Sequence, residues 1–496
     1  MCGQVARLVV LGCFFLVGLL LRLESLAGRA IWYDEAYSIW ASSQPLARIV
    51  QESATNDPHP PGYYLLLSAW SSLTGSGLMT ARALSLVFWV VSAALTYRLA
   101  SELFGPDTGA GTVCLLSLHA FQVIAAAEAR MYMPLEALGL VATWLLWRAT
   151  RPQAPSGRWL AYGLSVAALA YVSYYSVFLL AGHGVWLGAT RGRRHAKGAA
   201  LAAAAALLAY LPWLPFLPGS VTSNTVPWRP PPDSGWAVAL LMTQSYGGHF
   251  RGVAGYYGGR SPGPVEAVVG IAPLALSAVG FLVSRKKCAE AAFLVGSSWA
   301  VPVAVAAAVS LALGKIAAYP YHLTYVQPYL AVLTSAAVER AWRPGTPGRA
   351  VALLGAVAVV AYAAAGADAA WRDLRYQPFR YDLAAGYLRR LYRPGDAVAY
   401  APQGLRRVMH YYYQPQADEL QLYVDPRRRD ASRKAAEAVR GFLGRRPSRL
   451  WVVLTPPLPP DLPELVGQEV VGAGYVRGPT VMFGAVRVDL FVRRVP

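Results

Sequence analysis

The most regular feature of this chain is a succession of apolar stretches separated by short polar segments. A helix needs about 20 predominantly apolar residues to cross a bilayer. Stretches that approach this length lie at residues 6–26, 80–103, 109–128, 132–148, 159–175, 176–190, 199–217, 264–284, 291–313, 322–341 and 350–369. The pattern therefore predicts a polytopic α-helical membrane protein with about eleven transmembrane helices.

Two apolar segments need a separate interpretation. The run at residues 62–74 ("GYYLLLSAWSSLT") is too short to span a bilayer, so we expect an interfacial or re-entrant helix there. The first apolar stretch reaches Arg22 without a small-residue cleavage site. It is therefore predicted to be an uncleaved first membrane helix rather than a signal peptide.

Composition agrees with this class. The chain is 55% hydrophobic and 14% charged, whereas a soluble chain is normally about 25% charged. The cysteines, Cys2, Cys13, Cys114 and Cys288, lie far apart along the chain. Their spacing indicates neither a disulfide framework nor a zinc site.

The charges of the connecting loops indicate an orientation. Four loops together hold thirteen Lys or Arg against two acids, Glu290 and Glu339. The basic residues are Arg148, Arg151, Arg158, Arg191, Arg193, Arg194, Lys197, Arg285, Lys286, Lys287, Arg340, Arg343 and Arg349. Basic loops stay in the cytoplasm, so the N-terminus is predicted to be cytoplasmic and the C-terminus extracytoplasmic. Residues 27–61, 128–132, 218–263 and 314–321 then lie on the outer side.

The chain changes character near Trp371. The segments "DAVAYAP", "LQLYVD" and "RLWVVLTPP" are typical of strands, and residues 430–442 have helical spacing. Residues 466–493 alternate around "GYVRGPT", which favours an antiparallel hairpin. We expect a membrane domain at 1–370, whose first outer loop (27–61) carries interfacial helices, and a small extracytoplasmic α/β domain at 371–496.

The predicted C-terminal domain is basic. It carries twenty-one Lys or Arg and twelve acids. Such a domain could rest on anionic lipid headgroups or hold an anionic substrate. A solvated surface that only caps the membrane part explains the charge equally well.

An acidic pair, Asp34–Glu35, follows the first apolar stretch within "IWYDEAYSIWAS". The Trp and Tyr residues around it are typical of an interfacial aromatic belt, and their spacing predicts a short amphipathic helix. Acidic residues in the first turn of a helix are favourable by themselves. The pair therefore either supports that helix or supplies a carboxylate to a reaction.

Other charged residues fall at predicted outer ends of membrane helices. "AEARMYMPLEAL" contains Glu128, Arg130 and Glu136, and Arg82 lies where another helix begins. Charges at this depth are costly unless they are paired or face a cavity, so they are functional candidates. The structural alternatives are a Glu128–Arg130 pair and an Arg82 side chain that extends to the membrane surface.

Histidines provide a weaker signal. In "DPHPPGYYLLL", Asp57 and His59 precede two prolines that disfavour helix before them. A lone Asp-x-His supports a divalent metal only weakly, because His249 and His322 are remote in sequence.

Two later outer segments add candidates. "GKIAAYPYHLTYVQPYL" offers Lys315, Tyr319, Tyr321 and His322. The segment 218–263, rich in Gly, Pro and Tyr, fits either a mobile lid over a sugar or an ordinary surface loop.

Taken in order, "WYDEAYS", "HPPGYYLLL", "TARALSLVF", "EARMYMPLEAL" and "YLPWLPFLP" resemble the GT-C superfamily of polyprenyl-phosphate-sugar-dependent glycosyltransferases. The similar branch is that of protein O-mannosyltransferases and aminoarabinose transferases. The resemblance covers about residues 1–340 and is most specific in the first 150. It implies a GT-C-type membrane domain that transfers a sugar, with inversion, from a polyprenyl phosphate to an acceptor at the outer face of the cell membrane.

The resemblance also implies residue roles. Asp34 would be the catalytic base, with Glu35 positioning the acceptor or the base, and Arg82, Arg130 and His59 would bind the donor phosphate. Candidate substrate-binding residues are Asp57, Glu128, Tyr132, Glu136, Lys315 and His322. The implied partners are a polyprenyl-phosphate-linked sugar, a lipid, glycan or protein acceptor, and membrane lipids. No nucleic acid and no cofactor is expected, apart from the weakly supported metal.

Two departures limit the resemblance. The late motif reads "YPYHLTYVQP", without the Arg-Tyr that this branch often has, and the oligosaccharyltransferase signature "WWDYG" is absent. A lipid-linked sugar transporter or flippase remains an alternative, although it predicts inverted repeats and charges near mid-bilayer. A non-catalytic membrane scaffold is a second alternative.

Overall fold

The structure, a computed structural model, describes residues 2–27, 30–190, 192–219, 231–244, 264–342, 349–375, 379–424 and 428–494. The chain forms two compact units. The first, here called the membrane unit, comprises Met1–Ala27 and Ser42–Leu374, and the second, the α/β unit, comprises Gly28–Ala41 and Arg375–Pro496.

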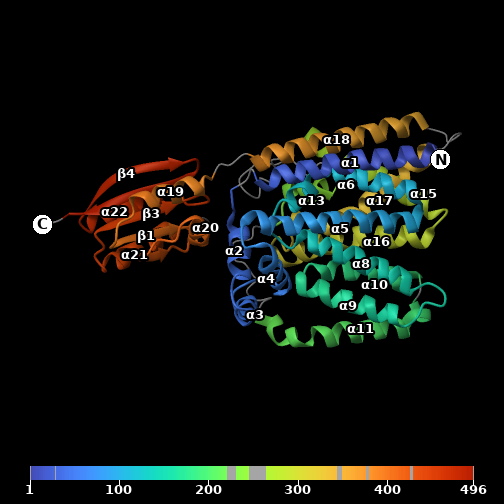
Figure 1. Cartoon of the computed structure of the whole chain (residues 1–496), viewed down its shortest axis with the longest axis horizontal. Coiled ribbons are helices and arrows are strands. Elements are labelled where there is room, and N and C mark those ends of the chain that lie inside the picture. The colour runs from blue at the N-terminus through green and yellow to red at the C-terminus, as the bar shows by residue number, and fades with distance from the viewer. Residues whose placement is uncertain are drawn as a thin grey trace. The chain divides into compact units, whose positions relative to one another are not determined.

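The membrane unit is helical throughout its described residues. Its helices are α1 (Cys2–Ala27), α3 (Leu46–Thr55), α4 (Gly62–Thr74), α5 (Leu78–Phe104), α6 (Pro106–Ser117), α7 (Ala120–Ala126), α8 (Tyr132–Ala149), α9 (Gly157–Val172), α10 (Ser176–Thr190), η1 (Gly192–His195), α11 (Ala196–Tyr210), η2 (Leu211–Phe216), α13 (Ser234–Gln244), α15 (Pro264–Arg285), α16 (Ala289–Leu313), η3 (Pro320–Val326), α17 (Gln327–Trp342) and α18 (Arg349–Arg375). The long helices lie alongside one another as a bundle (Figure 1).

The outside of this bundle is apolar. Leu20, Leu208 and Leu354 are 62%, 70% and 71% exposed. Soluble proteins rarely expose contiguous apolar surface of this kind, whereas lipid chains favour it. In the described part of the chain, the helical stretches long and apolar enough to cross a membrane are Gln4–Leu26, Leu78–Phe104, Ala196–Gly219, Ala289–Leu313 and Leu354–Arg372, and the bent pair α6–α7 can form one more span.

Every apolar stretch identified in the sequence contains helical structure, and the prediction of a polytopic α-helical membrane protein is confirmed. The number of spans, about eleven, stays a prediction. The short run 62–74 forms α4, as expected, and its interfacial position also stays a prediction.

The stretch 109–128 is not one helix. It forms α6 and α7, which meet at an angle of 69°. The guanidinium of Arg22, on α1, explains the break: its Nη1 donates to the carbonyls of Gly18 (2.8 Å) and Ser117 (2.9 Å). The last carbonyls of a helix have no partner within that helix. Arg22, which also lies over the Trp89 ring at 3.9 Å, therefore stabilises the end of α6 inside the bundle.

The α/β unit is built on one five-stranded sheet. Its elements are α2 (Tyr33–Ser42, which ends in the membrane unit), α19 (Tyr381–Leu391), β1 (Asp396–Ala401), α20 (Leu405–Tyr412), β2 (Asp418–Gln421), α21 (Ala431–Leu443), β3 (Arg449–Leu454), α22 (Leu462–Gly472), β4 (Tyr475–Phe483) and β5 (Val486–Arg493). The strand order is β2-β1-β3-β5-β4. β1 pairs in parallel with β2 and β3, while β5 is antiparallel to β3 and β4.

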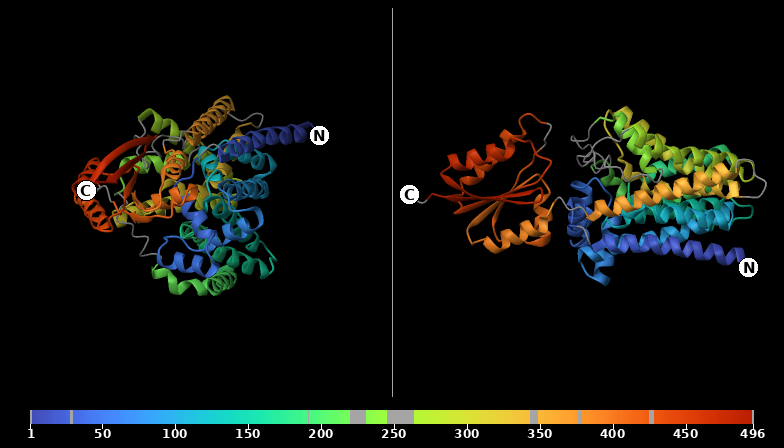
Figure 2. Two further views of the ribbon diagram at one scale, coloured as in Figure 1. Left: turned by 60° about the vertical axis from the view of Figure 1, so that its left-hand side comes forward. Right: turned by 90° about the horizontal axis from the view of Figure 1, so that it is seen from above.

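Helices cover both faces of this sheet (Figure 2). Successive strand residues point to opposite faces, so Ala397 and Ala399 pack against α21 and α22 in the main core. On the other face, the Trp451 ring packs on the ring of Tyr387 in α19, with 6.0 Å between the ring centres. The Tyr400 ring packs on His410 of α20, with 6.1 Å between the ring centres.

The predicted strands and the helix near 430–442 are confirmed, but the predicted hairpin is wrong in its limits. Residues 462–472 form α22, because Leu462, Val466 and Val470 are buried at four-residue spacing. The segment "GYVRGPT" lies at the start of β4 rather than in a turn. The hairpin turns instead near Gly484, whose φ of +62° favours glycine.

The α/β unit also contains residues 28–41, which the apolar pattern assigned to the membrane domain. The Tyr33 and Tyr381 rings pack edge to face, with 6.2 Å between their centres. The Arg407 guanidinium lies over the rings of Tyr37 and Trp40. These aromatic residues pack against protein, and their position at a membrane interface stays a prediction.

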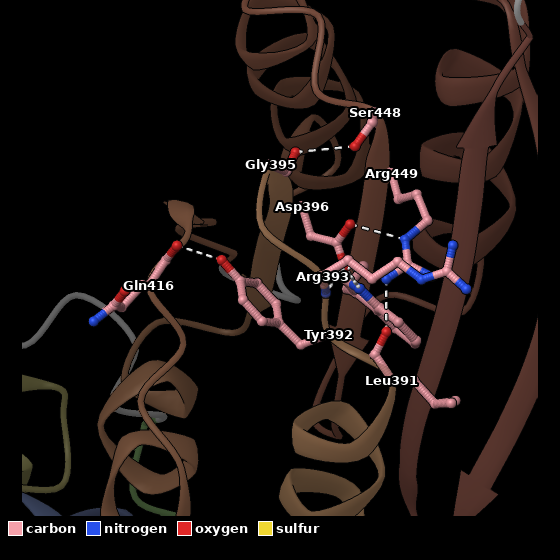
Figure 3. A network of polar contacts seen from close by, with 9 residues as sticks. Leu391, Tyr392, Arg393, Gly395, Asp396, Gln416, Ser448 and Arg449 are labelled. Atoms are coloured by element: carbon pink, nitrogen blue, oxygen red, sulfur yellow. Dashed lines mark hydrogen bonds and ion pairs between the residues drawn. The ribbon is translucent and has the colours of Figure 1, made fainter.

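One buried ion pair anchors the start of the sheet (Figure 3). The carboxylate of Asp396 is fully buried and accepts hydrogen bonds from Arg449 Nη2 (2.6 Å) and Nε (2.8 Å). It also accepts from Trp451 Nε1 and the backbone N–H of Arg393, both at 2.9 Å. Asp396 therefore joins β1 and β3 to the segment after α19.

We predict that Asp396→Asn destabilises the α/β unit by about 3 kcal/mol, because it removes the fully buried carboxylate that is paired with Arg449 and accepts from Trp451 Nε1. Urea-dependent proteolysis of the full-length protein measures this. The matched control is Asp418→Asn, which removes an exposed pair with Arg445 and should change the free energy of unfolding by less than about 1 kcal/mol. Equal effects of the two substitutions would contradict the anchoring role.

Candidate functional site

The segment between α3 and α4 brings three predicted site residues together. Asp57 is buried, and its Oδ1 accepts hydrogen bonds from the backbone N–H of His59 (3.0 Å) and from His59 Nδ1 (2.8 Å). An ionised carboxylate can only accept, so Nδ1 carries a proton. The other ring nitrogen, Nε2, faces Nη2 of Arg130 at 3.5 Å. The His59 ring therefore lies between the Asp57 carboxylate and the Arg130 guanidinium, and contacts both.

The local sequence explains why this segment has one position. Pro60 and Pro61 are both buried, and α4 begins directly after them at Gly62. A Cβ on Gly62 would lie 2.4 Å from the carbonyl oxygen of Tyr171, at the end of α9. Only glycine permits this approach. The stiff Pro-Pro pair and the close contact together hold His59 in place.

The charge state of Asp57 follows from its neighbours. Burial alone would raise the pKa of this carboxyl, but His59 outweighs it through its charge and its hydrogen bond. Tyr64 and the positive charge of Arg130 act in the same direction. The pKa of Asp57 is therefore lowered, and the carboxylate is ionised near neutral pH.

The two arginines are connected through α5. Arg130 is 4% exposed and lies in the turn between α7 and α8. Ser85 Oγ donates to the carbonyls of Glu128 (2.5 Å) and Arg130 (3.4 Å), so α5 holds this turn. Arg82 lies one helical turn before Ser85, is fully buried, and donates from Nη1 to the carbonyl of Leu26 (2.8 Å). The alternative that Arg82 extends to the membrane surface is therefore wrong. We call His59, Arg82 and Arg130 the basic cluster.

Glu136 belongs to a different network. Gln122 Nε2 donates to the Glu136 carboxylate and to Oε1 of Gln327 (3.1 Å), which links α7, α8 and α17 inside the bundle. Glu128 is also buried, in the turn that carries Arg130.

Two further predicted residues, Tyr132 and His322, lie in a group of packed aromatic rings. The ring centres of Tyr132 and Tyr321 are 5.8 Å apart, and those of Tyr321 and His322 are 4.3 Å apart. His322 stacks on Tyr175 at 4.1 Å, and its Nδ1 accepts a hydrogen bond from the backbone N–H of Tyr319 (3.0 Å). Lys315 is exposed after α16. Most of segment 218–263 lies outside the described residues.

Asp34 and Glu35 lie in the first turn of α2, in the α/β unit. Glu35 is fully buried and Asp34 is half-buried. The carbonyl of Asp34 accepts a hydrogen bond from Ser38 Oγ at 2.8 Å. This position is compatible with both interpretations of the pair, support of the helix and chemistry.

Sequence reasoning missed Arg22, Ser85, Gln122 and Gln327. Arg22 carried a usable signal, because an ionisable residue inside an apolar stretch is a functional candidate by default. Ser85 carried none, since serine is common in membrane helices and only the fold shows what it contacts. Among the residues that the structure describes, no three His, Cys, Asp or Glu side chains could together hold a metal ion.

Comparisons with known proteins agree on one architecture. The family model for dolichyl-phosphate-mannose-protein mannosyltransferases matches residues 58–216 of the 496, a range that contains the basic cluster. ArnT from Cupriavidus metallidurans, solved with undecaprenyl phosphate, is 15% identical with a TM-score of 0.63, and the alignment covers 97% of each chain. The protein has the GT-C fold. The fold that the resemblance implied is thereby confirmed.

Archaeal solved structures support the same fold. AglB, the oligosaccharyltransferase of Archaeoglobus fulgidus, solved with an inhibitory peptide and dolichol-phosphate, is 12% identical with a TM-score of 0.58. The alignment covers 91% of this chain and 70% of that one. The same species' oligosaccharyltransferase tethered to an acceptor peptide is 13% identical with a TM-score of 0.58, covering 90% and 68%. No curated protein matches the chain by sequence.

The lowered pKa of Asp57 gives a testable pH dependence. The ionised carboxylate stabilises the folded protein at every pH above its ordinary pKa of about 3.9, and this is lost as pH falls through the lowered pKa. Asp57→Asn should cost about 1.5–3 kcal/mol at pH 7, because a charged acceptor is lost. The difference in melting temperature between parent and variant should therefore hold from pH 7 to about 4 and narrow below.

Thermal unfolding of the purified proteins between pH 7 and 3 measures this difference. Asp107→Asn is the control, since Asp107 is exposed and pairs only across the surface with Arg7. A difference that has already vanished well above pH 4 would contradict a lowered Asp57 pKa.

Proposed function

We propose that this protein is a membrane glycosyltransferase that moves a sugar from a polyprenyl phosphate to an acceptor hydroxyl. The observation that carries the proposal is the basic cluster, with Arg82 and Arg130 buried and His59 partly buried, held by Asp57 and Ser85 within a GT-C bundle. The family match over 58–216 supports it. So do the undecaprenyl phosphate and dolichol-phosphate present in structures of the same fold.

The chemistry explains why such a cluster is needed. The acceptor oxygen forms a bond to the anomeric carbon while the bond from that carbon to the phosphate oxygen breaks, with inversion. The acceptor proton passes to a carboxylate base. The donor phosphodiester carries one negative charge, and the released polyprenyl phosphate carries nearly two near neutral pH. Cations placed where this charge develops lower the barrier.

Each member of the basic cluster suits one part of this task. A guanidinium offers planar paired donors that match phosphate oxygens, so Arg130 is proposed as the main phosphate contact. Asp57 holds the His59 ring with Nε2 toward Arg130. Arg82 adds a fixed positive charge within α5. Burial of Arg82 and Arg130 strengthens their interactions, because water screens these two charges less.

The base is proposed to be Asp34, with Glu35 in support, as the resemblance implies. A general base must lie within reach of the proton that it removes, and a half-buried carboxylate can meet a substrate. Glu128, Tyr132, Glu136, Lys315 and His322 remain candidates for substrate contacts. The acceptor is a lipid, a glycan or a protein, and the membrane domain is proposed to extend over 1–370.

The test separates binding from chemistry. Purified protein receives a panel of radiolabelled polyprenyl-phosphate sugars and host membranes as acceptor. In Asp34→Asn, stability and donor binding should persist, because a charge in the first turn of a helix contributes only about 0.3–1 kcal/mol. Single-turnover transfer should fall about 10²- to 10⁴-fold, because an amide cannot accept the proton. In Arg130→Gln, donor affinity should fall about 10- to 100-fold.

Asp382→Asn is the control, since Asp382 also lies in the first turn of a helix of the α/β unit. Its transfer rate should stay at the parental value. Full transfer by Asp34→Asn would assign the base to another carboxylate, Glu128 or Glu136 first. A parent that transfers none of the donor sugars would contradict the glycosyltransferase proposal itself.

The orientation is also a proposal, with the N-terminus cytoplasmic and the α/β unit outside. It rests on the basic loops, of which one contains the exposed Cys288. Tyr423→Cys in a cysteine-free chain should react with an impermeant thiol reagent in intact cells, because Tyr423 is 78% exposed. A chain that keeps only Cys288 should react after permeabilisation alone. The reverse pattern would overturn the orientation.

A further inference from the structure

Helix α2 presents one face to the rest of the α/β unit. Tyr33, Tyr37 and Trp40 recur at a spacing of four and three residues, which places them on one side of a helix. All three contact residues of the C-terminal domain. Asp34 lies about 100° around the helix from Tyr33. The face that packs is therefore distinct from the side that carries the acid.

Arg407 makes the contact at the C-terminal half of α2. Its Cζ lies 4.5 Å from the Trp40 ring centre and 5.0 Å from that of Tyr37. The two rings are themselves 5.7 Å apart and tilted by 48°. A guanidinium over an aromatic face is attracted by the ring quadrupole, and this contact uses two rings. Arg407 belongs to α20, far from α2 in sequence.

The N-terminal half of α2 is held by other residues. The Tyr33 ring packs so closely on Gly404 that a Cβ there would lie 3.1 Å from Tyr33 Cδ1. The φ of Gly404, +91°, also favours glycine. Just before α2, the backbone N–H of Ile31 donates to the hydroxyl of Tyr412 at 3.2 Å. Contacts at both ends of the helix fix its position and its rotation on the domain.

We propose that the C-terminal α/β domain is the device that positions helix α2, and that Arg407 is a positioning residue for Asp34. The proposal rests on the function proposed above for Asp34. The aromatic face and Arg407 set how the helix is turned on the α/β unit, and with it the direction of the Asp34 side of the helix.

The test uses Arg407→Gln and Arg407→Lys in the full-length protein. Hydrogen exchange of peptides from 33–42 should be about five- to tenfold faster in the Gln variant, because the helix opens more often. Exchange of β1 and β3 should not change. Single-turnover transfer should fall about tenfold with an unchanged donor Kd, and Lys should recover part of the rate, since it keeps the charge over the rings.

A double variant distinguishes positioning from a general loss of stability. In an Asp34→Asn background, Arg407→Gln should cause no further loss of the residual transfer, because it acts through Asp34. The matched control is Arg406→Gln, from the same helix, whose side chain approaches Glu419 at 3.8 Å. It should leave both exchange of 33–42 and transfer at parental values.

The outcomes are separable. Unchanged exchange of residues 33–42 in Arg407→Gln overturns the holding contact, and this readout does not depend on activity. Faster exchange with unaltered transfer overturns the positioning of Asp34. A parent without any transfer contradicts the glycosyltransferase proposal, while the exchange data still decide whether Arg407 holds α2.

Discussion

The cost of burying charge in an apolar bundle is the constraint on which this structure depends. An ionised group without partners cannot remain in such a place, so each buried charge must be met by carbonyls, rings or opposite charge. Arg22 is met by the carbonyls of Gly18 in α1 and Ser117 in α6, and by the Trp89 ring. Asp57 is met by His59. The breaks in regular structure occur where these charges are held.

This constraint connects local irregularity to chemistry. A continuous helix over 109–128 would pair the carbonyl of Ser117 within the helix, so this carbonyl could not serve Arg22. The bend between α6 and α7 provides acceptors for Arg22 and leads into the turn that Ser85 holds. Two successive departures from helix are therefore used: the bend after α6 stabilises Arg22, and the turn after α7 carries Arg130.

Much of the fold was predictable because bilayer thickness imposes a length on apolar segments, which is a local property of the sequence. The strands of the C-terminal domain were predictable for a similar reason, since a short apolar run and an alternating pattern are both local properties of the sequence. The break at Leu118 was not, because it depends on Arg22, which lies about one hundred positions earlier. The α22 error arose because Leu462, Val466 and Val470 fit both a helix and an irregular strand pattern until their burial is known.

In the candidate site, too, local contacts could be predicted from the sequence, whereas contacts between distant segments could not. Asp57 and His59 are two residues apart, so their association could be expected from the sequence. The contact of His59 with Arg130 depends on tertiary structure, and the resemblance to a family was needed to place them together. The packing of Tyr33 and Trp40 on the C-terminal domain was not predictable, because aromatic residues beside a membrane helix suit a lipid interface equally well.

The assignment of α2 to the α/β unit has a consequence for biosynthesis. Arg375 follows Ala41 by 334 positions, so the ribosome completes the whole bundle before it makes the surface on which α2 packs. At about 5–20 residues per second, that interval lasts on the order of tens of seconds. During this time the acidic helix is present without its partner, and a nascent chain cannot acquire the finished arrangement. Helix α2 can therefore reach its final packing only after the C-terminal domain has been synthesised and has folded.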